Sequence, residues 1–221
     1  MHIPDGILPA PICIAGYGLT GFTTWFCLHK INRSPEPTQG VPKAALLTAA
    51  FFTASLVHIP IPPASVHFVL NGLLGAVLGY YAFPAILVGL FLQAVMFGHG
   101  GLSTLGVNAV IMGIPALIAY FVFQLRDRIP KAHNPKLVTG FFAFLSGAIA
   151  VALAALLFYT LIVFNLPSDL NATAEQAALT TLSLAHIPLI GLEGIFTAIV
   201  VVFLERVKPD LLRNTWSKAA S

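Results

Sequence analysis

The feature that most constrains this chain is a series of long apolar segments separated by short polar ones. Hydrophobic residues fill 57% of the 221 positions and charged residues only 9%, whereas a soluble domain carries about 25% charged residues. An α-helix needs about 20 consecutive apolar residues to cross the hydrocarbon core of a bilayer. Seven apolar segments are candidate spans, at residues 8–29, 43–58, 65–81, 84–98, 104–125, 137–165 and 183–205. Most approach the required length, and 43–58 and 84–98 are short. We therefore expect an all-α membrane protein, a single integral domain over residues 1–221 with about seven transmembrane helices.

The basic residues indicate how these helices are threaded through the membrane, because cytoplasmic loops collect Lys and Arg. With seven spans, all 11 basic residues fall on one side: Lys30, Arg33 and Lys43 after the first span, Arg126, Arg128, Lys131 and Lys136 after the fifth, and Arg206, Lys208, Arg213 and Lys218 in the tail 206–221. This distribution predicts an N-terminus outside and a C-terminus in the cytoplasm. The net charge of +3 then reflects topology and does not indicate nucleic-acid binding.

The tripeptide His-Ile-Pro occurs three times, at residues 2–4, 58–60 and 186–188. Proline biases the residue before it toward extended backbone, so we expect each histidine at a helix boundary. On the predicted topology all three lie on the outer face, together with the Pro-rich turn 58–67 and the Gly-rich segment 98–108. Non-helical backbone at membrane depth persists only where protein buries it or water reaches it. The pattern predicts an outer cavity into which imidazoles point.

The histidine at position two has a particular capacity for metal binding. The pair Met1-His2 can offer three nitrogens to one ion: the α-amine of Met1, the deprotonated amide of His2 and Nδ1 of the His2 ring. Ni(II) and Cu(II) prefer square-planar nitrogen coordination, and an imidazole from the cavity would complete it. Asp5 is a candidate acceptor that orients a ligand ring. For His58, His99 and His186, a hydrogen-bonded packing role is the main alternative to a functional one.

Four motifs in order resemble the CbiM/NikM family: MHIPDGILP at 1–9, SVHFVLNGLLG at 65–75, FGHGGLSTLGVN at 97–108 and HIPLIGLEG at 186–194. Members of this family are the substrate-binding membrane components of energy-coupling-factor transporters for cobalt and nickel. The resemblance runs over nearly the whole chain. It implies a seven-helix subunit whose N-terminal loop, residues 1–8, inserts into an outer cavity and binds Ni(II) or Co(II) through Met1, His2 and His67. The motifs do not separate nickel from cobalt.

The resemblance also implies a setting and partners. The chain would be a multi-pass protein in the cell membrane of a prokaryote, capturing Ni(II) or Co(II) as substrate and carrying no catalytic cofactor. Its implied partners are a membrane coupling subunit similar to CbiQ or NikQ, ATPase subunits similar to CbiO or NikO, and a small accessory membrane subunit. The sequence has no G-x-x-x-x-G-K-[ST] motif for ATP phosphates. We therefore expect a transporter subunit that is not itself an enzyme.

The remaining polar residues leave alternatives open. Asn108, Asp5 and His58 are candidates to support the N-terminal loop or the metal ligands. Glu193 could form a structural network with His186 or His58, or these three could serve as base and ligands of an intramembrane metal-dependent enzyme. An autonomous metal channel or carrier is a further alternative, although ion-coupled carriers usually contain acidic residues in their spans. An extension before Met1 would distinguish the metal-capturing subunit from the intramembrane enzyme. An enzyme site within the helices should tolerate it, and the proposed chelate should not.

Overall fold

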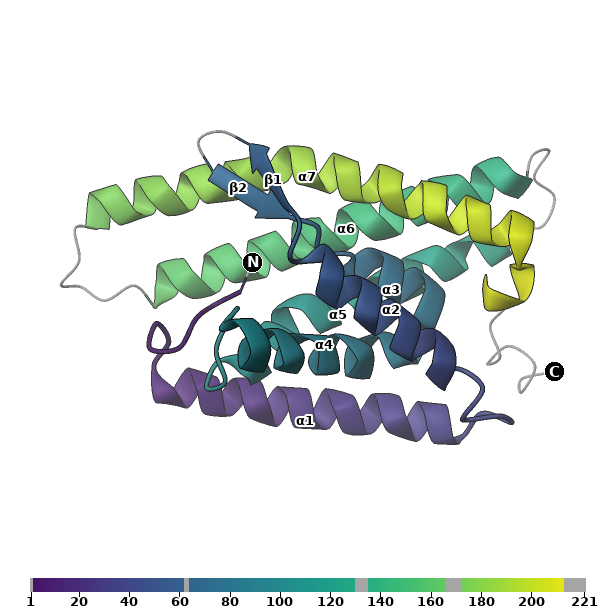
Figure 1. Ribbon diagram of the computed structural model, residues 1–221, viewed down its shortest axis with the longest axis horizontal. Coiled ribbons are helices and arrows are strands. Elements are labelled where there is room, and N and C mark those ends of the chain that lie inside the picture. Colours follow the sequence, from purple (N-terminus) through teal and green to yellow (C-terminus); the bar gives the residue numbers. More distant parts are fainter. Residues whose placement is uncertain (1, 62–63, 130–134, 166–171, 213–221) are drawn as a thin grey trace.

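The computed structural model describes residues 2–61, 64–129, 135–165 and 172–212, which form a bundle of α-helices with one short β-hairpin (Figure 1). The α-helices of these residues are α1 (Ala10–Asn32), α2 (Val41–Ala54), α3 (Asn71–Leu78), α4 (Ala82–Phe97), α5 (Leu105–Gln124), α6 (Pro135–Phe164) and α7 (Ala172–Val207). Short 3₁₀ turns follow α3, α5 and α7: η1 (Gly79–Tyr81), η2 (Leu125–Arg128) and η3 (Pro209–Leu212). Strands β1 (His58–Ile61) and β2 (Ala64–His67) pair antiparallel, with His58 opposite His67.

Five helical stretches are long and apolar enough to cross a membrane: Ala10–Asn32, Asn71–Phe97, Leu105–Arg128, Pro135–Phe164 and His186–Val207. The expectation of a helical membrane protein is therefore confirmed. The expected spans at 65–81 and 84–98 do not each form a helix of membrane length, because α3 has only 8 residues and the candidate stretch Asn71–Phe97 contains α3, η1 and α4 together. Gly79 ends α3 with a φ of +60°, a conformation that glycine adopts without steric cost.

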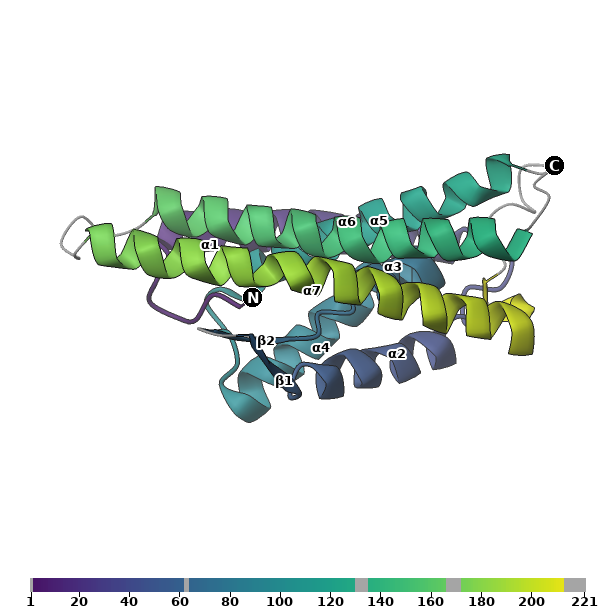
Figure 2. The same cartoon turned by 90° about the horizontal axis from the view of Figure 1, so that it is seen from above.

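Helix α5 is the centre of the bundle. It packs against α1, α3, α4 and α6, with α1 along one edge of the view in Figure 1 and the paired α6 and α7 along the other. All residues of α3 are buried. A Cβ added to Gly75 would lie 2.0 Å from the carbonyl oxygen of Ala116, so α3 and α5 are in backbone contact. Helix α2 packs on the outer side of α4, away from α6 and α7 (Figure 2).

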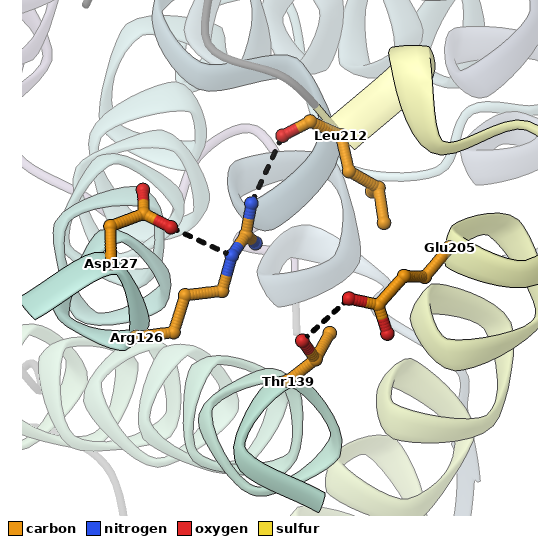
Figure 3. Close-up of polar contacts among 5 residues, drawn as sticks. All are labelled: Arg126, Asp127, Thr139, Glu205 and Leu212. Carbon is orange, nitrogen blue, oxygen red and sulfur yellow. Dashed lines mark hydrogen bonds and ion pairs between the residues drawn. The ribbon is translucent and has the colours of Figure 1, made fainter. Parts of the chain in front are cut away.

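Polar contacts tie the chain together at the end of the bundle where α1 ends and α2 begins (Figure 1). The Arg126 guanidinium donates to the Leu212 carbonyl at 3.0 Å and forms an ion pair with Asp127 at 3.3 Å, while Thr139 donates to Glu205 at 2.8 Å (Figure 3). Lys43 of α2 donates to the carbonyls of Val77 and Leu211, both at 2.9 Å. These bonds hold η3 against α2, α3 and η2.

The three His-Ile-Pro sequences do not share one backbone conformation. Residues 2–4 are non-helical and residues 58–60 lie in β1, as expected for residues before proline. His186, however, lies within α7, which starts at Ala172 and contains Pro188. The prediction of a helix boundary at His186 is therefore wrong, because membrane helices tolerate proline where neighbouring groups satisfy the freed carbonyl.

Candidate metal-binding site

Three histidines from distant parts of the chain form a cluster. His2 lies in the N-terminal segment before α1, His67 is the last residue of β2, and His99 follows α4. The ring centroids are 5.4 Å apart for His2 and His67, 4.3 Å for His2 and His99, and 5.2 Å for His67 and His99. One ring nitrogen of each lies within 4.8 Å of the other two.

The size of the histidine cluster suits a single metal ion. Because a metal–imidazole bond is about 2.0–2.1 Å long, two nitrogens on opposite sides of one ion are about 4 Å apart. The observed separations of up to 4.8 Å therefore require only small ring movements to bring the three imidazoles onto one ion.

His2 is held in the neutral form that binds metals. Burial lowers its pKa well below the usual 6.5, and the positive charge of the N-terminus and the nearby rings of His99 and His67 lower it further. Both ring nitrogens are buried and have no hydrogen-bond partner among the described residues. Since a proton and a metal compete for the same imidazole lone pair, a lowered pKa favours the metal.

His67 is fixed by its own backbone. Its Nδ1 lies 2.9 Å from the carbonyl oxygen of Phe68. A carbonyl can only accept, so Nδ1 carries the proton and Nε2 carries the lone pair. The segment that follows His67 is held by α7, because Glu193 accepts hydrogen bonds from the backbone N–H groups of Val69 and Leu70. Leu70 has a φ of +53°, in the sparsely populated left-handed region.

Asn108 of α5 pairs with both backbone polar groups of Ile3, the residue after His2. Its Oδ1 accepts from the Ile3 N–H at 2.9 Å and its Nδ2 donates to the Ile3 carbonyl at 3.0 Å. The Thr104 hydroxyl donates to the same carbonyl at 2.6 Å. Ile3 is fully buried and Asn108 is 2% exposed. The backbone next to His2 is thus hydrogen-bonded as if to a neighbouring strand.

Asp5 anchors the N-terminal segment at a second point. Its carboxylate accepts from the N–H groups of Leu102 and Ser103, at 3.1 and 2.8 Å, and from the Ser103 hydroxyl at 2.5 Å. The Ser103 hydroxyl is the main cause of a lowered pKa for Asp5. A Cβ added to Gly101 would lie 2.1 Å from the carboxylate, so only glycine leaves room here. Asp5 therefore binds the 98–104 loop, and the structure does not place it against a ligand ring as the sequence suggested.

The other candidates from the sequence are placed as follows. Met1 and the side chain of His58 lie outside the described residues, although the backbone of His58 pairs with His67. His186 and Glu193 are buried in α7, and neither is part of the histidine cluster in the described residues.

Sequence reasoning left the role of His99 open and did not single out Thr104. The Gly-rich segment around His99 was a usable signal, since Gly100 has a φ of +90° and a Cβ there would lie 3.5 Å from the Cβ of His2. A loop of this kind permits close approach of another segment. Which segment approaches is a matter of tertiary structure.

Comparisons with known proteins identify relatives of this chain. Residues 2–211 match the model of the CbiM family, described as a cobalt uptake substrate-specific transmembrane region. The chain is 34% identical, over 97% of its length and 98% of the other, to a Haemophilus influenzae protein named for metal transport. It is 30% identical to the fused nickel transport protein NikMN of Rhodobacter capsulatus, covering all of this chain and 66% of that one. It is 29% identical to the cobalt transport protein CbiM of Sorangium cellulosum, over 96% and 94% of the two chains.

Solved structures share the fold. A crystal structure of a transition metal transporter superposes with a TM-score of 0.76 at 24% identity, covering all of this chain and 98% of the other. The match of the family model over nearly the whole length, together with these relatives, identifies the chain as a member of the CbiM family.

Proposed function

We propose that this protein is the substrate-binding membrane subunit of an energy-coupling-factor transporter, and that it captures Ni(II) or Co(II) from the outside at the cluster of His2, His67 and His99. Its family and its structural neighbours are transporters, which implies a transport role and not an enzymatic one. The observation that carries the proposal is the convergence of three imidazoles, one of them on the N-terminal segment, within a single-ion distance.

The ion would be bound by nitrogen ligands only. His2 supplies its ring and its backbone amide, Met1 its α-amine, and His67 the fourth nitrogen of a square plane, the geometry that Ni(II) prefers. His99 lies next to both rings and would be a further ligand. Neutral imidazoles and a deprotonated amide suit a divalent ion of intermediate softness better than Mg²⁺ or Ca²⁺, which take oxygen ligands.

The hydrogen bonds that hold the N-terminal segment favour a metal site that forms when this segment docks onto the helices. Asn108 and Thr104 hold Ile3, and Asp5 holds the 98–104 loop. Capture would then consist of binding the ion between the docked segment and His67. Uphill transport would draw its energy from separate ATPase chains through a membrane coupling subunit, as the resemblance to energy-coupling-factor transporters implies.

Equilibrium binding of Ni(II), Co(II), Zn(II) and Cu(II) to purified, untagged protein in detergent tests the proposal. Loss of a residue that hydrogen-bonds a metal ligand lowers metal affinity by about 10–100-fold. Loss of a ligand itself should cost more, so we expect His67→Ala to weaken Ni(II) binding by more than about 100-fold. Inserting one Ala between Met1 and His2 should have a similar effect, because it changes the chelate rings. His29→Ala, which removes an imidazole stacked on Trp25 at the other end of α1, should leave the affinity unchanged.

Two results would contradict the proposal. One is unchanged Ni(II) affinity in a protein whose N-terminus is blocked by a tag or an acetyl group. The other is equal weakening by His67→Ala and His29→Ala, which would place the metal elsewhere.

A further inference from the structure

Gln93 of α4 is a buried amide whose orientation is fixed by its neighbours. It is 0% exposed, and its Nε2 lies 2.9 Å from Oγ of Ser55, at the C-terminal end of α2. The Ser55 hydroxyl donates its own proton to the carbonyl of Phe52 at 2.7 Å. The Ser55 oxygen must therefore accept from Gln93, so the NH₂ group of Gln93 faces Ser55 and Oε1 points the other way.

The turn of α4 that carries Gln93 lies next to the histidine cluster that includes His2. The Oε1 atom of Gln93 is buried and has no hydrogen-bond partner of normal geometry among the described residues, and the same is true of both His2 ring nitrogens. The backbone of Gln93 also accepts from the His99 N–H at 3.1 Å, which places this turn of α4 directly beside the histidine cluster.

We propose that Gln93 is a positioning residue for the metal ligand His2: Oε1 of Gln93 accepts a hydrogen bond from the Nε2–H of His2 and thereby directs Nδ1 to the metal. The inference rests on the proposed function, in which His2 chelates through its amide and Nδ1. Histidine ligands generally donate their second ring N–H to an acceptor, which fixes the tautomer and the plane of the ring. Here the acceptor is fixed in turn by Ser55, so α2 and α4 together determine which nitrogen of His2 meets the ion.

Paired substitutions at Gln93 separate this role from packing. Gln93→Met has similar size and shape but no acceptor, and Gln93→Glu restores an oxygen at the same place. Gln124→Met, at the far end of α5, is the matched control. The measurements are Ni(II) affinity by calorimetry, the visible absorption band of the Ni(II) complex, and the thermal unfolding temperature of the metal-free protein.

We expect Gln93→Met to weaken Ni(II) binding by about 10–100-fold, the usual effect of losing an outer partner of a ligand histidine. Its absorption band should shift, because His2 is no longer held in one tautomer. Gln93→Glu should restore both the affinity and the band, and Gln124→Met should match the unmodified protein. Ser55→Ala leaves the amide unoriented and should shift the band in the same direction with a smaller loss of affinity.

Unchanged affinity and absorption in Gln93→Met would overturn the inference while leaving the proposed function intact. Equal weakening by Gln93→Met and Gln93→Glu with an unshifted band would overturn it too, since that result indicates packing. Should Gln93→Met fail to fold, an unshifted absorption band in Ser55→Ala would overturn the inference. If the unmodified protein binds no Ni(II), or binds it equally well with a blocked N-terminus, the proposed function fails and this inference fails with it.

Discussion

Asn108→Ala removes the side chain that holds the N-terminal segment against α5. Three hydrogen bonds disappear, two to the backbone of Ile3 and one to the Thr104 hydroxyl. The Ile3 carbonyl keeps its bond from Thr104, but the Ile3 N–H loses its partner. Because Ile3 is fully buried, that N–H must either remain unpaired or leave the protein interior together with the segment.

The size of the effect follows from these contacts. Each of the two bonds to Ile3 contributes about 1 kcal/mol net, and an unpaired buried N–H costs a further 1–3 kcal/mol or so. The N–H regains water as a partner when the segment undocks, so this cost falls on the docked state alone, whereas the Ile3 carbonyl keeps its bond from Thr104 and loses little. We therefore expect a total loss of about 2–3 kcal/mol in docking free energy. At about 1.4 kcal/mol per factor of ten, the docking equilibrium falls by roughly 30- to 150-fold. The apparent dissociation constant for the metal is the intrinsic constant divided by the docked fraction, so the apparent affinity should fall by at least about tenfold.

The assay is Ni(II) titration of untagged protein, together with the thermal unfolding temperature of the metal-free form. Asn71→Ala is the matched control, because Asn71 is also fully buried and donates to two backbone carbonyls, those of Met112 and Ala150. It lies in the core at the start of α3. We expect Asn71→Ala to lower the unfolding temperature with nearly unchanged Ni(II) affinity. Asn108→Ala should instead weaken Ni(II) binding with a nearly unchanged unfolding temperature.

A change of less than about threefold in Ni(II) affinity for Asn108→Ala would refute the reasoning, since docking would then not depend on the pairing with Ile3. Asn108→Leu adds a second check, because it retains volume but offers no hydrogen bond. If Asn108→Leu binds normally, the side chain acts by filling space.

Four further predictions concern the same region. Glu193→Leu leaves the N–H of Leu70 without its acceptor, so the Ni(II) affinity and the unfolding temperature should both fall. Glu193→Gln should give values between those of the unmodified protein and Glu193→Leu. Ni(II) titration and thermal melts measure the two quantities. Gly101→Ala places a Cβ against the Asp5 carboxylate and should weaken Ni(II) binding in calorimetry, and normal binding would exclude a close approach of Asp5 to Gly101. Because burial lowers the pKa of His2, its contribution to the stability of the metal-free protein is present above the unfolded value of about 6.5 and is lost as pH falls below it, in melts from pH 7.5 to 5. Ni(II) binding should nevertheless release protons at pH 7, mainly from the amine, whose reference pKa is about 7.7–8.0, and from the amide; calorimetry in two buffers that detects no release would contradict the chelate.

Hydropathy is sufficient to predict the helical membrane fold, because the length of an apolar run reports the thickness it can cross. Hydropathy does not predict the boundaries of individual helices and strands where tertiary packing decides them. The segment 65–81 is apolar throughout, yet its first residues form β2, and the helix begins only at Asn71. Apolar composition does not distinguish a buried strand from a buried helix. Pro188 predicts a boundary although α7 continues through it, since tertiary packing overrides local preference.

The site was partly predictable for a different reason. His2 and His67 stood out through motif and position, and the structure brings their rings together with His99. No periodicity connects residues 2, 67 and 99, so their meeting point depends on how β2, α4 and the N-terminal segment pack. The hydrogen-bond donors to Asp5 were equally hidden, because they include backbone N–H groups of Leu102 and Ser103, which any sequence could supply.

The pairing of Ile3 with Asn108 also sets an order of events during synthesis, since 105 positions separate the two residues. Ribosomes add about 5–20 residues per second, so roughly 5–20 seconds pass between the appearance of His2 and that of its support on α5. During this interval the first span can enter the membrane, but its N-terminal segment has no docking partner at Asn108. The proposed metal site would therefore be a late product of biogenesis, although its first ligand is made early.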